Sequence, residues 1–191
     1  LNRIENVPAI NERRNTPGEY CSLYRERFLP QEVKSKALGS KVTWILPPHS
    51  RYQGIGETAL TDGLYGGSTY VESWVGWEGE NASFVLDMGE EKEFTKIESD
   101  FLHQLGAWVL LPKGGNYSIS SDGETYEEFG TFTIPEDRDV RVKFTKGTVE
   151  KPAPVKARYI KVEIEGTIEC PYWHYGIGFP AWFFIDEGSV Y

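Results

Sequence analysis

The segment Cys170–Phe184 has a high density of aromatic side chains. It reads CPYWHYGIGFPAWFF, with seven aromatic residues among fifteen positions. Proline and glycine interrupt its first half, which is therefore predicted to be an irregular connection rather than a strand. Aromatic rings offer a flat apolar face with a polar edge at low entropic cost, which suits the C–H face of a sugar ring. The candidate ligand contacts on this connection are Tyr172, Trp173, His174 and Tyr175.

A second aromatic group lies in the glycine-rich stretch 62–80. It contains Tyr65, Tyr70, Trp74 and Trp77. Tyr65 and Tyr70 join the candidate contacts, with Glu72 as a polar partner. For both groups a second interpretation stays open, because bulky rings also fill the space at the ends of a sandwich where strands run out.

The common catalytic signatures do not occur in the sequence. We find no Gly-x-Ser-x-Gly elbow, no glycine-rich phosphate loop before a helix and no His-Glu-x-x-His. The three histidines are scattered along the chain, and adjacent carboxylates on a strand point to opposite faces. The sequence therefore disfavours catalysis by this chain alone.

Charge and composition exclude further classes. The chain of 191 residues has a formal net charge of −9, so we expect no nucleic acid partner. No apolar run approaches the roughly 18 residues of a membrane span. The first residues show neither Met nor a signal-peptide pattern, which predicts a processed end or an excised fragment. The sequence leaves open whether its two cysteines, Cys21 and Cys170, pair.

The charge also divides the chain. Residues 1–40 carry seven basic and five acidic side chains, whereas residues 41–191 carry 13 and 24 and hold 24 of the 27 aromatic residues. We predict that residues 1–40 are a linker or the trailing edge of an upstream domain. Apolar positions between Tyr20 and Phe28 predict one short helix there.

From Ser40 onward the hydrophobic pattern has the period of a strand. The predicted strands are 41–46, 83–87, 94–101, 107–111, 116–120, 127–133, 139–145, 159–164 and 181–185. In the run 139–145, Val140, Val142 and Phe144 would point inward. Short strands with frequent turns and no long helix predict an all-β domain of about eight strands, a sandwich or jelly roll over residues 41–191.

Several motifs occur in the order found in one family. They are Thr58–Trp77 (TALTDGLYGGSTYVESWVGW), Leu86–Gly89 (LDMG), Tyr117–Phe129 (YSISSDGETYEEF), Ala157–Val162 (ARYIKV) and Ala181–Val190 (AWFFIDEGSV). Together they resemble the discoidin domain, the factor V/VIII C-type fold that includes the family-32 carbohydrate-binding modules. The resemblance is strongest to versions appended to glycoside hydrolases of Bacteroides-like bacteria, such as β-hexosaminidases.

The resemblance implies an eight-stranded antiparallel jelly-roll sandwich with one structural calcium ion (Ca2+). It places the metal carboxylates at Asp62 and Glu187, with loop carbonyls completing the oxygen shell that calcium prefers. The alternatives are that Asp62 only caps its own turn and that Glu187 is a solvated strand end.

The resemblance further implies a non-catalytic carbohydrate-binding module of a larger secreted glycoside hydrolase. Its partners would be a glycan and an upstream catalytic domain, in the periplasm or outside the cell. Two other functions stay open: a structural domain that braces the catalytic domain, and a free-standing glycan-active enzyme.

Ligand residues vary between members of this family, so the resemblance does not fix which residues contact the ligand here. After the residues named above, His103 and Gln104 are the next candidate contacts. Trp74, Trp108 and Trp182 are predicted to be in the core, and Trp77 in either place. A polar partner beside the stacking ring would come from Arg51, Arg138 or Asn81.

Overall fold

A computed structural model of the chain describes residues 34–71 and 73–191. Seven antiparallel strands make up most of it. They are β1 (Lys41–Leu46), β2 (Val75–Glu78), β3 (Ala82–His103), β4 (Gly114–Ser120), β5 (Glu127–Thr133), β6 (Lys143–Glu165) and β7 (Trp182–Val190). Three single-turn 3-10 helices accompany them: η1 (Ser50–Tyr52), η2 (Gly56–Thr58) and η3 (Leu105–Ala107). The all-β prediction is confirmed, while the predicted helix at Tyr20–Phe28 and Cys21 lie outside the described residues.

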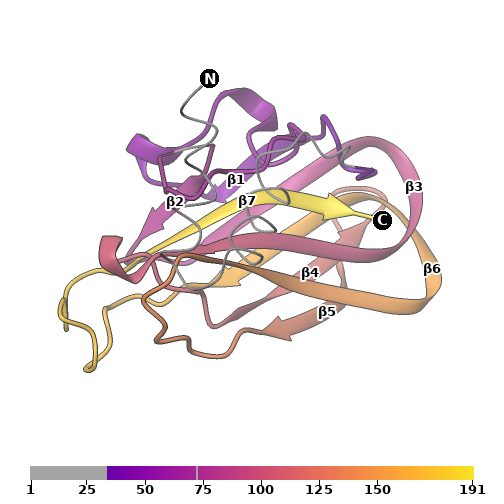
Figure 1. The fold of residues 1–191 in the computed structure, drawn as a ribbon. Coiled ribbons are helices and arrows are strands. Elements are labelled where there is room, and N and C mark those ends of the chain that lie inside the picture. Colours follow the sequence, from indigo (N-terminus) through magenta and orange to yellow (C-terminus); the bar gives the residue numbers. More distant parts are fainter. Residues whose placement is uncertain (1–33, 72) are drawn as a thin grey trace, which may run out of the picture. The chain divides into compact units, whose positions relative to one another are not determined.

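Two long strands, β3 and β6, build the sandwich by bending together (Figure 1). The first half of β3 pairs with β1 and with the end of β6, and β6 in turn pairs with β4. The second half of β3 pairs with the start of β6 and with β7, which carries β2. One continuous antiparallel sheet thereby folds into two layers around a shared core.

β3 and β6 each take in two of the nine predicted runs, and β2 is an additional strand, so the described residues hold seven strands where about eight were predicted. The predicted runs 83–87 and 94–101 are both part of β3, which continues through a bulge with left-handed Gly89. Polar residues at this bend interrupt the hydrophobic period without ending the strand. The run 107–111, in contrast, is the end of η3 followed by isolated bridges at Val109.

The prediction that Val140 points inward is wrong. β6 begins only at Lys143, and Val140 is 81% exposed. The carboxylate of Asp139 accepts the backbone N–H of Arg141 at 3.0 Å and its guanidinium at 2.6 Å. These bonds hold residues 139–141 in a turn, so the alternating residues of this run do not form a strand.

Stacked aromatic rings fill the space between the layers. Trp77 is 1% exposed and stacks on Phe183 with ring centroids 5.4 Å apart. Its indole N–H donates to the Leu46 carbonyl at 3.1 Å, so the buried donor is satisfied. Trp77 and Trp74 are therefore core residues, whereas Trp108 and Trp182 are only half-buried.

The residues just before β1 also pack on the sandwich. The backbone N–H of Lys36 donates to the Val190 carbonyl at 2.7 Å, and Val190 N–H donates to the Ser35 hydroxyl at 3.0 Å. Ser35, Ala37 and Ser40 are buried. The packed unit thus includes residues 34–40, ahead of the boundary at 41 that the sequence predicts.

Candidate ligand-binding site

Three connections meet at one end of the sandwich. Gly114, at the start of β4, pairs with Thr133 at the end of β5 and with Glu165 at the end of β6. His103, at the end of β3, pairs with Lys143 at the start of β6. The antiparallel register therefore brings the connections 104–113, 134–142 and 166–181 together at this edge.

The connection 166–181 forms a closed loop. Cys170 N–H donates to the Phe179 carbonyl and Gly178 N–H to the Cys170 carbonyl, at 2.8 and 3.0 Å. Gly178 has a φ of +79°, a conformation that other residues rarely adopt. The proline and glycine positions that predict an irregular connection thus shape a compact loop, which holds the predicted aromatic residues.

His174 fixes this loop to the neighbouring turn η3. It is 5% exposed, its Nε2 lies 3.1 Å from the Leu105 carbonyl, and its Nδ1 accepts the Gly176 N–H at 3.1 Å. Because Nδ1 is the acceptor, the neutral ring carries its proton on Nε2 and donates it to Leu105. Both ring nitrogens are bonded to the backbone, which assigns His174 to holding the loop.

Trp173 projects from the loop toward a polar group on the connection 134–142. Its indole N–H donates to Glu136 Oε2 at 2.9 Å, and Arg138 Nε donates to Glu136 Oε1 at 2.7 Å. The Arg138 guanidinium lies 5.0 Å from the Trp173 ring centroid and 5.7 Å from that of Tyr172. Of the three candidate polar partners, Arg138 is the one beside Trp173 and Tyr172.

The electrostatics keep this group charged. Hydrogen bonds from the Trp173 indole and then from Arg138 lower the pKa of the Glu136 carboxyl. The hydrogen bond that Arg138 donates to Glu136 in turn raises the pKa of the Arg138 guanidinium. Glu136 is thus an ionised acceptor whose two oxygens each hold one donor and retain free lone pairs.

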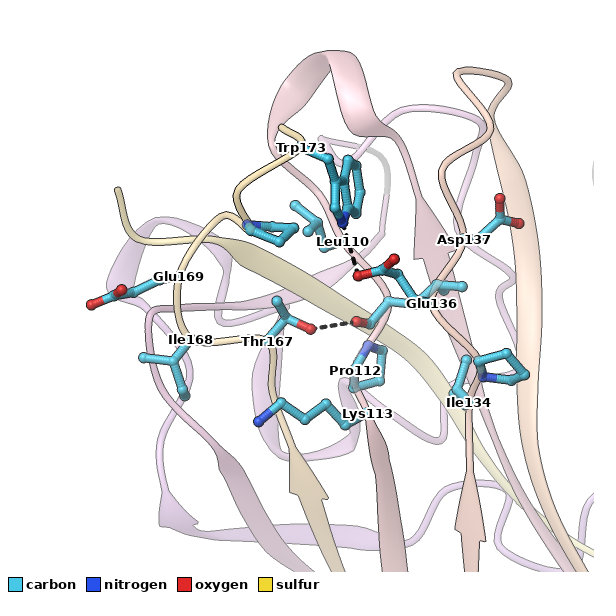
Figure 2. A pocket seen from close by; sticks show the side chains of 13 residues that line it. Leu110, Pro112, Lys113, Ile134, Glu136, Asp137, Thr167, Ile168, Glu169 and Trp173 are labelled. Carbon is cyan, nitrogen blue, oxygen red and sulfur yellow. Dashed lines mark hydrogen bonds between the residues drawn. The ribbon is translucent and has the colours of Figure 1, made fainter. Parts of the chain in front are cut away.

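A cavity of about 560 Å³ opens below Trp173 (Figure 2). Figure 2 shows Trp173 at its top, Glu136 beside the indole, and Pro112 and Ile134 as apolar walls lower down. The Thr167 hydroxyl, which also lines the cavity, donates to the Leu111 carbonyl at 2.9 Å. The lining residues are Leu110, Leu111, Pro112, Lys113, Ile134, Pro135, Glu136, Asp137, Thr167, Ile168, Glu169, Pro171 and Trp173.

Ion pairs with Lys143 hold the connection 134–142 in place. Lys143 Nζ lies 2.7 Å from an Asp137 oxygen and 3.0 Å from an Asp139 oxygen. His103 is fully buried next to Asp137, and burial lowers the pKa of its imidazole, which keeps it neutral. His103 is thus buried close to this connection and is not one of the residues that line the cavity.

This architecture matches a known family. The family model for the F5/8 type C domain matches residues 45–183. The chain belongs to the F5/8 type C domain family. No match is found among curated protein sequences.

Solved structures share the fold of this F5/8 type C domain. A family-32 carbohydrate-binding module from a family 31 glycoside hydrolase of Clostridium perfringens matches at 21% identity and a TM-score of 0.52, over 80% of this chain and 94% of that one. A fucolectin from striped bass (Morone saxatilis) serum matches at 18% identity and a TM-score of 0.53, over 84% of this chain and 49% of the fucolectin chain. A GH29 fucosidase of Ruminococcus gnavus, in complex with fucose, matches at 15% identity and a TM-score of 0.53, over 91% of this chain and 28% of the fucosidase chain. The chain thus spans about half of the lectin and about a quarter of the fucosidase.

Of the remaining predicted contacts of this F5/8 type C domain, those within the described residues do not line the cavity below Trp173. Tyr70 is half-buried and packs against Tyr52 and Phe184. Tyr65 lies beside Tyr191, and burial above all raises its pKa to about 12. Glu72 lies outside the described residues. Gln104 is half-buried, the Arg51 N–H donates to His49, and Asn81 Oδ1 accepts Gly166 N–H.

Asp62 and Glu187 lie together, as the resemblance implies. Glu187 is 2% exposed, its Oε1 accepts Gly63 N–H at 3.0 Å, and its Oε2 has no hydrogen-bond partner among the described residues. Burial first, and then the Asp62 carboxyl, raise the pKa of Glu187 to about 8. Glu187 is therefore not a solvated strand end, while Asp62 does cap its turn through Leu64 N–H at 2.8 Å.

A calcium ion fits the chemistry of this pair. A hard cation between the two carboxyls would neutralise their charge and take Glu187 Oε2 as a ligand, with oxygens of the glycine-rich loop completing its shell. In the described part of the chain no group of three or more His, Cys, Asp or Glu could hold a metal, so backbone oxygens would have to supply the remaining ligands. The buried hydroxyl of Thr69, on the same glycine-rich stretch, is another oxygen without a hydrogen-bond partner among the described residues.

Within residues 34–71 and 73–191, no helix has the length and apolar character needed to cross a membrane.

Proposed function

We propose that this F5/8 type C domain is a non-catalytic carbohydrate-binding module whose ligand occupies the cavity below Trp173. The observation that carries the proposal is the Trp173 indole, hydrogen-bonded to Glu136 at the mouth of a 560 Å³ cavity with apolar walls. The family membership and the shared fold with a carbohydrate-binding module and a fucolectin support it.

The groups around the cavity have complementary roles. The Trp173 ring offers an apolar face for the C–H face of a sugar. Glu136 accepts hydroxyl protons, and Arg138 and the Tyr172 hydroxyl supply donors on the exposed side. Since Glu136 already joins Trp173 and Arg138, these groups are positioned before the ligand arrives, which lowers the entropic cost of binding.

We propose that the module serves a larger secreted glycoside hydrolase and keeps it near its glycan. The C. perfringens module comes from a glycoside hydrolase, and the R. gnavus match is itself a fucosidase several times the length of this chain. We also propose one structural calcium ion between Asp62 and Glu187, which would supply positive charge to their carboxylates. This ion would support the fold and not the ligand.

A glycan array followed by calorimetric titration tests the binding function. Trp173→Ala should weaken binding of the best array glycan by at least about tenfold, because stacking and the Glu136 anchor are lost together. Tyr126→Ala is the matched control, since Tyr126 follows the β4–β5 turn at the other end of the sheet. Absence of binding to any array glycan at millimolar concentration would contradict the proposal and favour a bracing role.

A further inference from the structure

The loop that carries Trp173 presents a second set of rings beyond the cavity. The cavity wall on this loop ends at Trp173, and the rings that follow, Tyr175 and Phe179, are 68% and 60% exposed. Exposed apolar groups that lie close together on a surface are typical of ligand-binding sites.

Tyr175 is exposed but firmly held. Its hydroxyl donates to the Gly106 carbonyl at 2.9 Å, and its ring stacks on His174 with centroids 4.4 Å apart. The Trp108 indole supports it edge-on at 5.9 Å. His174 covers one face of the Tyr175 ring, while 68% of the residue stays exposed to solvent. A ring fixed in this way loses little side-chain entropy when it binds a ligand.

Trp108 shows that the loop end is built to hold these rings. It has a φ of 62°, a left-handed conformation that costs a bulky residue energy and persists only where its surroundings enforce it. Its backbone N–H donates to the Leu105 carbonyl at 2.9 Å, and its backbone carbonyl accepts the Trp182 N–H at 3.0 Å. The conformation places the indole beneath His174, Tyr175 and Phe179, with centroids 5.7–6.2 Å away.

The rings of Trp173 and Tyr175 lie on either side of His174 in the sequence and both contact it. His174 contacts both rings, with its centroid 6.0 Å from Trp173 and 4.4 Å from Tyr175. Because His174 is bonded to the backbone through both nitrogens, the spacing of the two rings is fixed. A single sugar in the cavity at Trp173 would leave the Tyr175 face uncovered.

We propose that the ligand is an oligosaccharide of at least two sugar residues, with one sugar in the cavity at Trp173 and the next on the exposed face of Tyr175. The inference rests on the proposed carbohydrate-binding function and adds the ligand's length. The Tyr175 oxygen, whose proton goes to Gly106, remains an acceptor for a hydroxyl of the second sugar.

Calorimetric titration against sugars of increasing length tests this. The probes are galactose, N-acetylglucosamine and fucose, each as the free monosaccharide and as the terminal residue of a disaccharide and a trisaccharide. For the sugar that binds, the disaccharide should bind about tenfold more tightly than the monosaccharide, the gain from one additional stacked ring. Tyr175→Ala should reduce this ratio to about one, and Tyr175→Phe, which keeps the ring, should retain most of it.

The outcomes separate the two proposals. Thermal melting confirms that each variant is folded, and Tyr126→Ala should leave the ratio unchanged. Equal affinity for monosaccharide and oligosaccharides in the unmodified protein, or an unchanged ratio in Tyr175→Ala, would overturn the oligosaccharide inference alone. Absence of binding to every probe and every array glycan would overturn the carbohydrate-binding function as well.

Discussion

Trp77 and Trp173 are the same residue type in two different surroundings. Trp77 lies between the sheet layers, 1% exposed, stacked on Phe183 and bonded to the Leu46 carbonyl. Trp173 lies on a loop, half-buried, with its indole bonded to a charged side chain at the mouth of a cavity. Both donors are satisfied, but only the second ring has room beside it for another molecule.

The difference teaches how the molecule divides its aromatic residues. Between the layers, the aromatic rings contact other core side chains. At the loop end, His174 and Tyr175 are held by hydrogen bonds from their side chains to backbone carbonyls of η3. The first region should therefore respond to mutation in stability and the second in ligand binding.

Alanine at the two tryptophans separates these responses most strongly. Trp77→Ala should lower the free energy of unfolding by about 3–5 kcal/mol, because it removes a large buried ring and leaves a cavity. Trp173→Ala should lower it by less than about 1 kcal/mol, since its ring is partly solvated. Urea denaturation followed by circular dichroism measures both, and similar losses would contradict the division.

Calcium should act on stability and leave the Trp173 end unaffected. Added at about one hundred times its dissociation constant, it should raise the free energy of unfolding by about 2.7 kcal/mol. Magnesium, which demands a tighter octahedral shell, should give a smaller rise. Scanning calorimetry in calcium and in chelator gives the comparison, with Glu187→Gln as the variant that should lose the rise. A calcium effect retained in Glu187→Gln would contradict the assignment.

The same carboxyl predicts a pH dependence in the metal-free protein. Folding raises the pKa of Glu187 from 4.5 to about 8, so the folded state keeps a proton that the unfolded state has lost between these values. Stability should then fall as pH rises from about 4.5 to about 8 and level off above. Denaturation midpoints at several pH values test the slope, and Glu187→Gln should reduce it. An equal slope in that variant would assign the effect to other groups.

Glu136→Gln is the smallest expected change at the loop end. The amide keeps the size of the side chain but loses the charge that Trp173 and Arg138 share. Glycan affinity should fall about fivefold, corresponding to roughly 1 kcal/mol. Titration calorimetry measures it beside Asp122→Asn, the matching loss of charge on the β4–β5 turn at the other end of the sheet. An unchanged affinity would remove Glu136 from the site.

Much of the fold follows from the sequence because its signals are local. Alternation predicts β1, β4 and β5 closely, and proline and glycine predict the irregular loop around Trp173. The bends in β3 and β6 were not predicted, because the polar residues at a bulge resemble those of a turn. The strand count depends on this distinction.

The candidate site was predicted only in part, because its polar partners come from distant segments. Glu136 and Asp137 were missed, and the acidic run before Lys143 contains the signal for a turn rather than a strand. His174 was expected to contact the ligand, but its partner Leu105 lies 69 positions away and is brought close only by the folded chain. Sequence spacing cannot show such a contact.

The central claim, that ligand binds beside Trp173, is tested most directly by the indole N–H signals in a proton–nitrogen NMR spectrum of the labelled protein. The best array glycan is titrated into the sample, with Trp173→Phe and Trp77→Phe used to assign the signals. We predict that the Trp173 indole signal shifts, since its partner Glu136 contacts the ligand, while the Trp77 signal, bonded to the Leu46 carbonyl, stays in place. A stationary Trp173 signal under saturating glycan would contradict the account.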